Sequence, residues 1–145
     1  MNIDNLIWID NCNTINWTEL SNLYKIAPLG DKPPSMLKTA FNNSAFTYFV
    51  YDDKKLIGVG RALADGVDSA YLCDIAIHPE YQGLGLGKAI TQKLLDSVKG
   101  YSKVILFANI GKEGFYEQLG FSKMTTAMAI FKNQDMAIQR GLIKK

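Results

Sequence analysis

The chain has few of the residues that build metal sites and little net charge. It contains two cysteines, Cys12 and Cys73, which form no CxxC pair, and a single histidine, His78. A zinc site made of cysteine and histidine ligands needs more such groups, so we expect no metal. Sixteen Lys and Arg residues against fourteen Asp and Glu residues give a formal charge of +2. Because no basic stripe with interleaved aromatic residues is present, we expect no nucleic-acid partner.

Long apolar runs and targeting signals are also missing. No apolar stretch approaches the length that crosses a bilayer, so we expect no membrane partner. Residues 1–14 carry Asp4 and Asp10 and lack the basic start and apolar run of a signal peptide, which predicts a cytoplasmic protein. Hydrophobic residues make up 48% of the 145 residues, enough for a core that needs no disulfide. We therefore predict one domain over residues 1–145.

The hydrophobic periodicity predicts alternating strands and helices. Asn16 and Glu19 form a capping-box pattern, so the first helix should begin at Trp17. The expected elements are a strand over residues 6–9, helices from residues 17 and 34, a hairpin of strands 46–51 and 56–63, almost wholly apolar and hence buried strands over 70–77 and 103–108, helices over 86–98 and 112–119, and a last strand over 124–131. That order predicts one mixed sheet flanked by helices, a fold of the α/β class.

The most informative segment is glycine-rich and lies between an apolar strand and a helix. It reads Tyr81-Gln82-Gly83-Leu84-Gly85-Leu86-Gly87-Lys88. Alternating glycines let the backbone turn sharply and approach a ligand, with several N–H groups pointing the same way. The helix that follows adds unpaired N–H groups and the positive end of its dipole. The segment thus predicts a diphosphate site; a glycine turn without a ligand is the alternative.

The spacing of the glycines disfavours two common phosphate loops. A P-loop needs Gly at the position of Gln82 and Ser or Thr at the position of Ala89. A dinucleotide fingerprint needs a third glycine where Lys88 stands. A Rossmann-type oxidoreductase is disfavoured for this reason.

Three stretches resemble the GNAT superfamily of acetyltransferases. Gln82-x-x-Gly85-x-Gly87 resembles its Q/R-x-x-G-x-G/A signature, and residues 56–65, with Gly58, Arg61 and Asp65, resemble the preceding hairpin of a bacterial and plant branch. The family's later strand, short helix and Gly-Phe are similar to Asn109 followed by Phe115-Tyr116-Glu117-Gln118-Leu119-Gly120-Phe121. The resemblance implies a single GNAT-like domain of α/β (α+β) class, with a central mixed, mostly antiparallel sheet whose strands splay apart between flanking helices.

The same resemblance implies acetyl-CoA, and free coenzyme A as product, with no metal. In the family, the pantetheine arm lies between the two splayed strands. The backbone of Ile75 and Ile77 would then bond the pantetheine amides and the thioester carbonyl, Asn109 would face the pantetheine, and Tyr116 would lie near the thioester sulfur. The diphosphate would be held by the amides of Gln82, Gly83, Leu84, Gly85, Leu86, Gly87 and Lys88.

Two residues are candidates for proton transfer. A phenol with a pKa near 10 can donate a proton to a departing thiolate, so Tyr116 is the predicted acid; a packing tyrosine is the alternative. Asp74 is the only charged residue of the strand over 70–77, where an unpaired buried carboxylate is costly. It is the predicted base, directly or through water, and the alternative is a structural carboxylate paired with Arg61 or a backbone amide.

Together these residues predict an acetyl-CoA-dependent N-acetyltransferase that acts on the primary amine of a small molecule by direct attack in a ternary complex. The resemblance places the acceptor beside the first two helices and their connection, residues 24–41, with Tyr24, Tyr48, Phe49 and Arg61 as lining residues. An acyl-CoA-binding or sensing module without turnover, and acetylation of a protein or peptide amine, are the alternatives. Homodimers are common in the family, so a homodimer is compatible with the resemblance.

Overall fold

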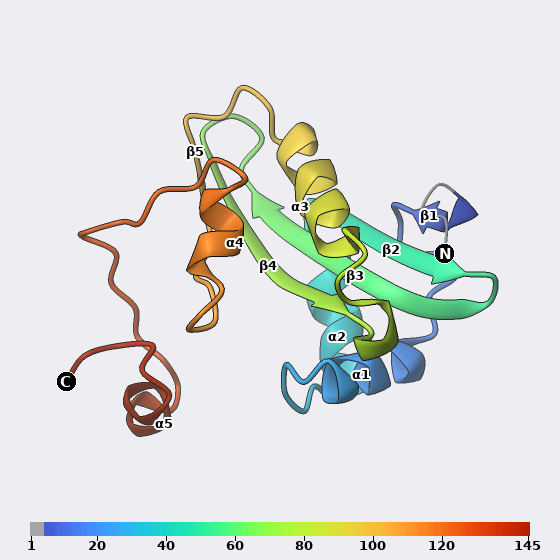
Figure 1. The fold of residues 1–145 in the computed structure, drawn as a ribbon, viewed down its shortest axis with the longest axis horizontal. Coiled ribbons are helices and arrows are strands. Elements are labelled where there is room, and N and C mark those ends of the chain that lie inside the picture. Colours follow the sequence, from blue (N-terminus) through green and yellow to red (C-terminus); the bar gives the residue numbers. More distant parts are fainter. Residues whose placement is uncertain (1–4) are drawn as a thin grey trace. The chain divides into compact units, whose positions relative to one another are not determined.

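The computed structural model describes residues 5–145, in two units that are treated one at a time. The first unit, Met1–Leu106, contains one five-stranded mixed sheet with the strand order β1-β2-β3-β4-β5 (Figure 1). Its strands are β1 (Ile7–Ile9), β2 (Phe46–Asp52), β3 (Lys55–Ala64), β4 (Ser69–Ile77) and β5 (Lys103–Ile105). The first four strands pair antiparallel and β5 joins β4 in parallel, so the predicted mixed, mostly antiparallel sheet is confirmed.

Three helices of the first unit cover the sheet: α1 (Trp17–Ile26), α2 (Pro34–Asn42) and α3 (Leu86–Ser97). The Asn16 side chain accepts the N–H of Glu19 at 3.1 Å, which confirms the predicted start of α1. The Glu19 carboxylate does not complete a reciprocal capping box but accepts the N–H of Leu56 on β3, also at 3.1 Å. The residue expected to close the cap thus joins α1 to the sheet.

The two faces of the sheet bury different helices (Figure 1). Helices α1 and α2 cover one face, where the fully buried side chains of Tyr24, Phe41 and Phe49 form the centre of the core. Helix α3 covers the other face, and it approaches β3 closely at Gly58 and Gly60. A Cβ atom on Gly60 would lie 2.8 Å from a methyl carbon of Ile90, too close for any side chain. These glycines of β3 therefore set how near α3 lies to the sheet.

The second unit, Phe107–Lys145, contains the helices α4 (Glu113–Glu117) and α5 (Gln134–Gln139). Gly120 has a φ angle of +101° just after α4, as expected for a residue that ends a helix. The strand predicted over residues 124–131 is wrong, because these residues pair with no other strand in the part of the chain that the structure describes. A strand needs a partner for its backbone groups, and alternating apolar side chains do not provide one.

The prediction of a buried strand over residues 103–108 is also partly wrong. Strand β5 ends at Ile105, whose side chain is 40% exposed, and Phe107 is 58% exposed. An apolar run fits a buried strand only where something covers both faces. No helix formed by residues 5–145 is both long and apolar enough to span a bilayer.

Candidate active site

A β-bulge interrupts β4 at Asp74 and Ile75. Val59 pairs with Ala76 and Arg61 pairs with Cys73, so Gly60 alone lies opposite both Asp74 and Ile75. Asp74 adopts a φ angle of +58°, the left-handed conformation that bulges usually assign to glycine. Aspartate is one of the few other residues that tolerates this conformation. The bulge bends β4 and places the Asp74 side chain beside Arg61.

Strand β5 pairs with β4 along its whole length of three residues, from Ser69 with Lys103 to Tyr71 with Ile105. Strand β4 continues six residues farther, to Ile77, and within the described residues no strand pairs with this stretch on the β5 side. The splaying of two strands that the resemblance implies stays a prediction. Just after β4, the N–H of His78 donates to the carbonyl of Ile57 on β3 at 2.8 Å. Because backbone groups alternate in direction along a regular strand, those of Ile77 point away from β3, toward the side of β5. Ile75 lies in the bulge, where this alternation is interrupted, so the outward direction of its backbone groups stays a prediction.

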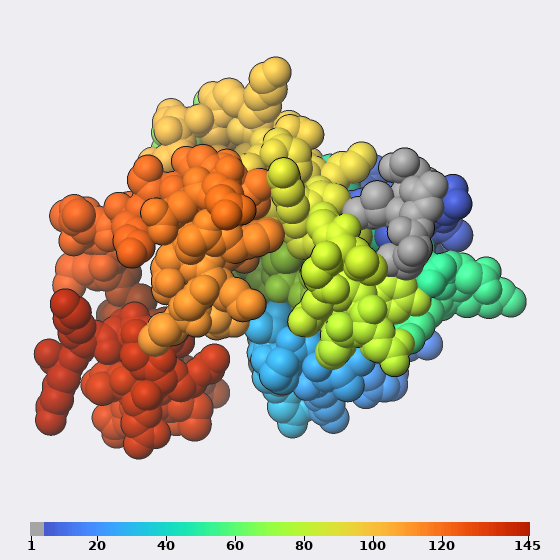
Figure 2. All heavy atoms as spheres, in the orientation of Figure 1, coloured from blue at the N-terminus to red at the C-terminus, as the bar shows by residue number. Residues whose placement is uncertain are grey.

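The glycine loop follows β4 and ends in the first turn of α3. Gly83 and Gly85 have φ angles of +80° and +85°, and nothing lies within 4 Å of the position of a Cβ atom on either residue. Gly85 is the N-cap of α3 and has no side chain to cap the first amides of the helix. These amides and the helix dipole suit a bound anion, so the backbone of residues 82–88 fits the diphosphate of coenzyme A. Figure 2 shows the yellow-green atoms of this region at the surface of the first unit.

Side chains hold the loop against the sheet. The Tyr81 hydroxyl donates to the Asp52 carboxylate at 2.6 Å, which ties the loop to the end of β2. The side-chain amide of Gln82 donates to the carbonyl of Ile77 at 3.2 Å. His78 accepts the N–H of Glu80 on Nδ1, so it is a residue of the turn after β4. The signature glutamine thus fixes the loop to the outward side of β4.

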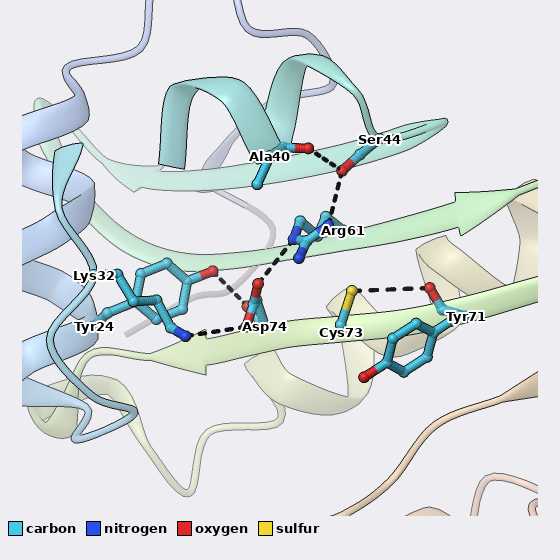
Figure 3. Close-up of polar contacts among 8 residues, drawn as sticks. All are labelled: Tyr24, Lys32, Ala40, Ser44, Arg61, Tyr71, Cys73 and Asp74. Atoms are coloured by element: carbon cyan, nitrogen blue, oxygen red, sulfur yellow. Dashed lines mark hydrogen bonds and ion pairs between the residues drawn. The ribbon is translucent and has the colours of Figure 1, made fainter. Parts of the chain in front are cut away.

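A polar cluster surrounds Asp74 on the α1 and α2 side of the sheet (Figure 3). Arg61 donates from Nε to one carboxylate oxygen at 2.8 Å, and Lys32 Nζ lies 3.6 Å from the other. The Tyr24 hydroxyl donates to the backbone carbonyl of Asp74 at 2.6 Å. Arg61 also donates to the Ser44 hydroxyl at 3.3 Å. Both oxygens of Asp74 are therefore paired, and the structural ion pair with Arg61 that the sequence left open is present.

Burial changes the acidity of the groups near this cluster. It raises the pKa of the Tyr24 hydroxyl well above its ordinary value, with the nearby Asp74 charge acting in the same direction. Burial also raises the pKa of Cys73 to about 11 and that of Tyr71 to about 12. A thiol of this kind stays protonated near neutral pH and is a poor nucleophile. The half-buried Cys73 thiol is therefore poorly suited to carry an acetyl group covalently.

The other two predicted site residues belong to the second unit. The Asn109 side chain is exposed, and its backbone carbonyl accepts the N–H of Lys112 at 2.9 Å. Tyr116 lies on α4, half-buried, with its ring edge-on to the rings of Phe115 and Phe121 at centroid distances of 5.0 and 5.9 Å. Burial raises the pKa of the Tyr116 hydroxyl. The roles of both residues toward the pantetheine and the sulfur stay predictions.

The predicted acceptor-lining residues need correction. Tyr24 and Phe49 are fully buried in the core and have no surface to offer a ligand. Tyr48 bonds Ser97 of α3 at 2.6 Å, so it lies on the opposite face of the sheet from α1 and α2. Successive residues of a strand point to opposite faces of the sheet, and the sequence did not show which residues of β2 face α1 and α2. Of the four, Arg61 and Tyr24 contact Asp74 in the polar cluster, and Tyr24 does so from within the core, through its hydroxyl.

Three further groups did not follow from the sequence. Asp65 accepts the N–H groups of Val67, Asp68 and Ser69 on one oxygen, which makes it a residue of the turn between β3 and β4. Lys32 joins the cluster from the connection between α1 and α2, and no pattern in the neighbouring sequence indicates that it belongs to the site. The bulge had one signal, a lone aspartate inside an apolar strand. A shallow cavity between β1, the start of α1 and the β2–β3 hairpin contains none of the predicted site residues.

Comparison with known proteins places this geometry in a family. Residues 10–121 match the acetyltransferase (GNAT) family. The chain belongs to the GNAT family of N-acetyltransferases. The predicted enzyme class is thereby confirmed, and the family acts on amines with acetyl-CoA. Among residues 5–145, no group of three or more His, Cys, Asp or Glu side chains is arranged to hold a metal ion.

Several relatives resemble the enzyme along most of its length. It is 33% identical to the uncharacterized N-acetyltransferase ycf52 of Pyropia yezoensis over 123 residues, which cover 81% of this chain and 71% of that protein. It is 37% identical to a ycf52-like N-acetyltransferase of Prochlorococcus marinus, over 75% of this chain and 64% of the relative. Relatives in Arabidopsis thaliana are named as chloroplastic, so a cytoplasmic location stays a prediction.

Solved structures share the fold at lower identity. A protein of Deinococcus radiodurans superposes with a TM-score of 0.80 at 21% identity, over 94% of this chain and 95% of that one. An acetyltransferase of Clostridium acetobutylicum, solved with acetyl-CoA, has a TM-score of 0.64 at 14% identity, over 87% and 96% of the two chains. The fold predicted from the sequence is confirmed.

Proposed function

We propose that the enzyme transfers the acetyl group of acetyl-CoA to the primary amine of a small molecule, by direct attack in a ternary complex. One observation carries the proposal: the open glycine loop at the N-terminus of α3 follows the stretch of β4 that extends beyond its pairing with β5. A diphosphate-binding backbone and outward-facing strand groups are thus joined in one unit. This is the arrangement that a diphosphate with a long amide-bearing arm requires.

In this proposal, the residues of the first unit bind and orient acetyl-CoA. The amides of residues 82–88 hold the diphosphate, and the outward backbone groups of Ile75 and Ile77 bond the pantetheine arm. The strand N–H groups near the bulge stabilise negative charge on the thioester oxygen during attack. Because the two reactants are held side by side, much of the rate acceleration comes from proximity and orientation.

The amine must be neutral when it attacks. Acetyl-CoA supplies a thioester carbon as the electrophile, whereas a primary amine with a pKa of about 10.4 is mostly an ammonium at neutral pH. The Asp74 carboxylate attracts this ammonium and accepts its proton directly or through water. Both Asp74 oxygens are engaged by Arg61 and Lys32, so this role requires that Lys32 first move away.

Tyr116 is the proposed proton donor to the departing thiolate. Its raised pKa keeps the phenol protonated at the pH of the reaction. Tyr116→Phe should lower kcat by about 100-fold, as loss of a general acid typically does, while the affinity for acetyl-CoA is kept. Tyr101→Phe, outside the proposed site, is the control. A Tyr116→Phe enzyme whose kcat is unchanged across pH would show that the tyrosine is a packing residue.

Binding and turnover can be separated by experiment. Calorimetry with acetyl-CoA and with free CoA tests the donor site, and release of the CoA thiol across arylalkylamines, polyamines, amino sugars and a lysine peptide tests the acceptor. We expect turnover of at least one small amine, with intersecting initial-rate lines that indicate a ternary complex. Uptake without turnover of any amine would indicate an acyl-CoA-binding module. Turnover of the peptide alone would indicate a protein acceptor, and absence of uptake would overturn the proposal.

A further inference from the structure

Lys32 brings an ammonium group to the proposed acceptor site from within the chain. It lies in the connection between α1 and α2, and Figure 3 shows its side chain directed at Asp74. Its Nζ lies 3.6 Å from the carboxylate and 5.6 Å from the centre of the Tyr24 ring. Its backbone is fixed as well, because the Ser21 hydroxyl donates to the Lys32 carbonyl at 2.6 Å. The ammonium is therefore held by a carboxylate and an aromatic face, two groups that recognise a cationic amine.

This ion pair differs from the other lysine pairs of the described residues. The Lys32 side chain is 31% exposed and that of Asp74 is 22% exposed. In the pairs of Lys25, Lys55 and Lys103, every lysine side chain is at least 45% exposed. Exposed pairs of that kind contribute little and form without any functional need. The pair of Lys32 with Asp74 is the shielded one, and it lies at the bulge.

The position of this amine matters because of its neighbour Ile75. If the outward backbone of Ile75 and Ile77 holds the pantetheine arm, the thioester lies beside the bulge, next to the carboxylate that pairs with Lys32. An amine held beside a thioester gains a high effective concentration over any free amine in solution. Lys32 then meets the same requirements as an external acceptor.

We propose that Lys32 is an internal acceptor, acetylated on Nζ by the acetyl-CoA that its own chain binds. This inference rests on the proposed function. The ammonium of Lys32 releases a proton to Asp74 or to water, and the neutral nitrogen forms a bond to the acetyl carbon. The carbon–sulfur bond breaks, and CoA leaves as a thiolate that takes up the second proton released by the attacking nitrogen. The product is an amide, which is not an acyl donor, so the reaction occurs once per chain and is not a step of the catalytic cycle.

Acetylation changes the acceptor site. The neutral amide can no longer form the ion pair with Asp74 or the cation–π contact with Tyr24, whereas Arg61 keeps its hydrogen bond to the other carboxylate oxygen. One side of Asp74 is then open to the ammonium of an external amine. The modification thus converts an internally occupied acceptor site into one that is ready for substrate.

The test uses the full chain and acetyl-CoA that carries an isotope-labelled acetyl group, with no amine added. Peptide mass spectrometry should find the label on Lys32 in close to one equivalent, at a first-order rate that does not depend on protein concentration. Lys25, which is exposed on α1, is the matched control and should be labelled only as slowly as in the heat-unfolded chain. Equal labelling of Lys32 and Lys25, or a rate that rises with protein concentration, would overturn the proposal.

Two variants separate this inference from the proposed function. Lys32→Arg keeps a positive charge beside Asp74 and should abolish the specific label while acetyl-CoA uptake is retained. Lys32→Gln resembles the acetylated residue and should lower KM for external amines several-fold relative to Lys32→Arg. If the chain binds acetyl-CoA and turns over external amines without labelling Lys32, this inference alone fails. If calorimetry finds no uptake of acetyl-CoA, the proposed function fails as well.

Discussion

The two faces of the sheet differ in the side chains that their strands present. On the α3 face, Gly58 and Gly60 carry no side chains, and the space is filled by apolar groups of Ile90 and Leu94. On the α1 and α2 face, the side chains at the bulge are charged, and Arg61 and Asp74 form a half-buried ion pair at 2.8 Å beside the apolar core.

Under the proposed function, this difference would let one sheet serve two substrates. The proposed donor site depends on backbone groups, which the α3 face positions by close packing and by the glycine loop. The proposed acceptor site depends on side chains, which the other face gathers around the Asp74 carboxylate. Substitutions on the α3 face should therefore change stability and coenzyme binding, whereas substitutions on the other face should change charge balance and acceptor recognition.

The largest effect is expected on the α3 face. Gly60→Val would place a Cβ atom 2.8 Å from Ile90 and should lower the free energy of unfolding by about 3 kcal/mol, because the packed helix cannot shift away freely. Urea unfolding measures this. Gly114→Ala is the control, since nothing lies within 4 Å of its Cβ position and α4 should gain up to about 1 kcal/mol. A Gly60→Val protein of normal stability would contradict the close packing.

The second-largest effect is expected on CoA binding, from a substitution in the glycine loop that precedes α3. Gly85→Val must adopt a φ angle of +85° and adds bulk where the diphosphate is proposed, so affinity for CoA should fall at least tenfold, about 1.4 kcal/mol. Gly100→Val carries the same backbone strain at the other end of α3, with a φ angle of +91° and open space around it. Calorimetry on both should separate strain from binding. Equal loss of affinity in both would exclude a specific role for the loop.

A smaller effect is expected on the charged face. Arg61→Met keeps an apolar stem against Phe41 but leaves Asp74 with Lys32 as its one remaining cationic partner among residues 5–145. Because both groups keep some contact with water, the free energy of unfolding should fall by about 1–2 kcal/mol and not by the full cost of an unpaired buried charge. Lys25→Met, which breaks an exposed pair with Asp31, should change it by less than about 0.5 kcal/mol. Similar losses of unfolding free energy in the two variants would show that the half-buried pair is no more stabilising than the exposed one.

The smallest effect should appear only at alkaline pH. The Cys73 thiol has a pKa of about 11 in the folded chain against an ordinary 9.0, because burial disfavours the thiolate. Below pH 9 the thiol is protonated in both the folded and the unfolded chain, and its full contribution to the free energy of unfolding is present. Between pH 9 and 11 the unfolded chain loses the proton and the folded chain keeps it, so stability falls as the pH rises.

Urea unfolding at several pH values can detect this contribution. The Cys73→Ala protein should lose less stability between pH 9 and 11 than the unaltered chain, whatever its stability at neutral pH. If the free energy of unfolding fell equally with pH in both proteins, burial at this position would not control the pKa of the thiol. Tyr71, with a pKa raised to about 12, should extend the decline above this range in both.

Local signals in the sequence predicted most of the first unit. The cap at Asn16, the hairpin at residues 52–55 and the glycines of the loop each act within a few residues, so their structural outcome followed directly. The segment over residues 124–131 had a strand-like pattern but no partner, and β5 proved shorter and more exposed than its apolar run indicated. Pairing is a long-range property, and a pattern along one segment does not contain it.

The sequence by itself determined the family, the glycine loop and the candidacy of Asp74, because these depend on residue types at fixed spacing. Only the tertiary structure decided that Arg61 and Lys32 pair with both oxygens of Asp74, that Tyr24 is buried against its carbonyl, and that Tyr48 faces away. The physical reason is that a bulge at one residue reverses the direction of the side chains beyond it and bends the strand. Which side chains contact the Asp74 carboxylate therefore depends on how helices pack that lie dozens of residues away along the chain.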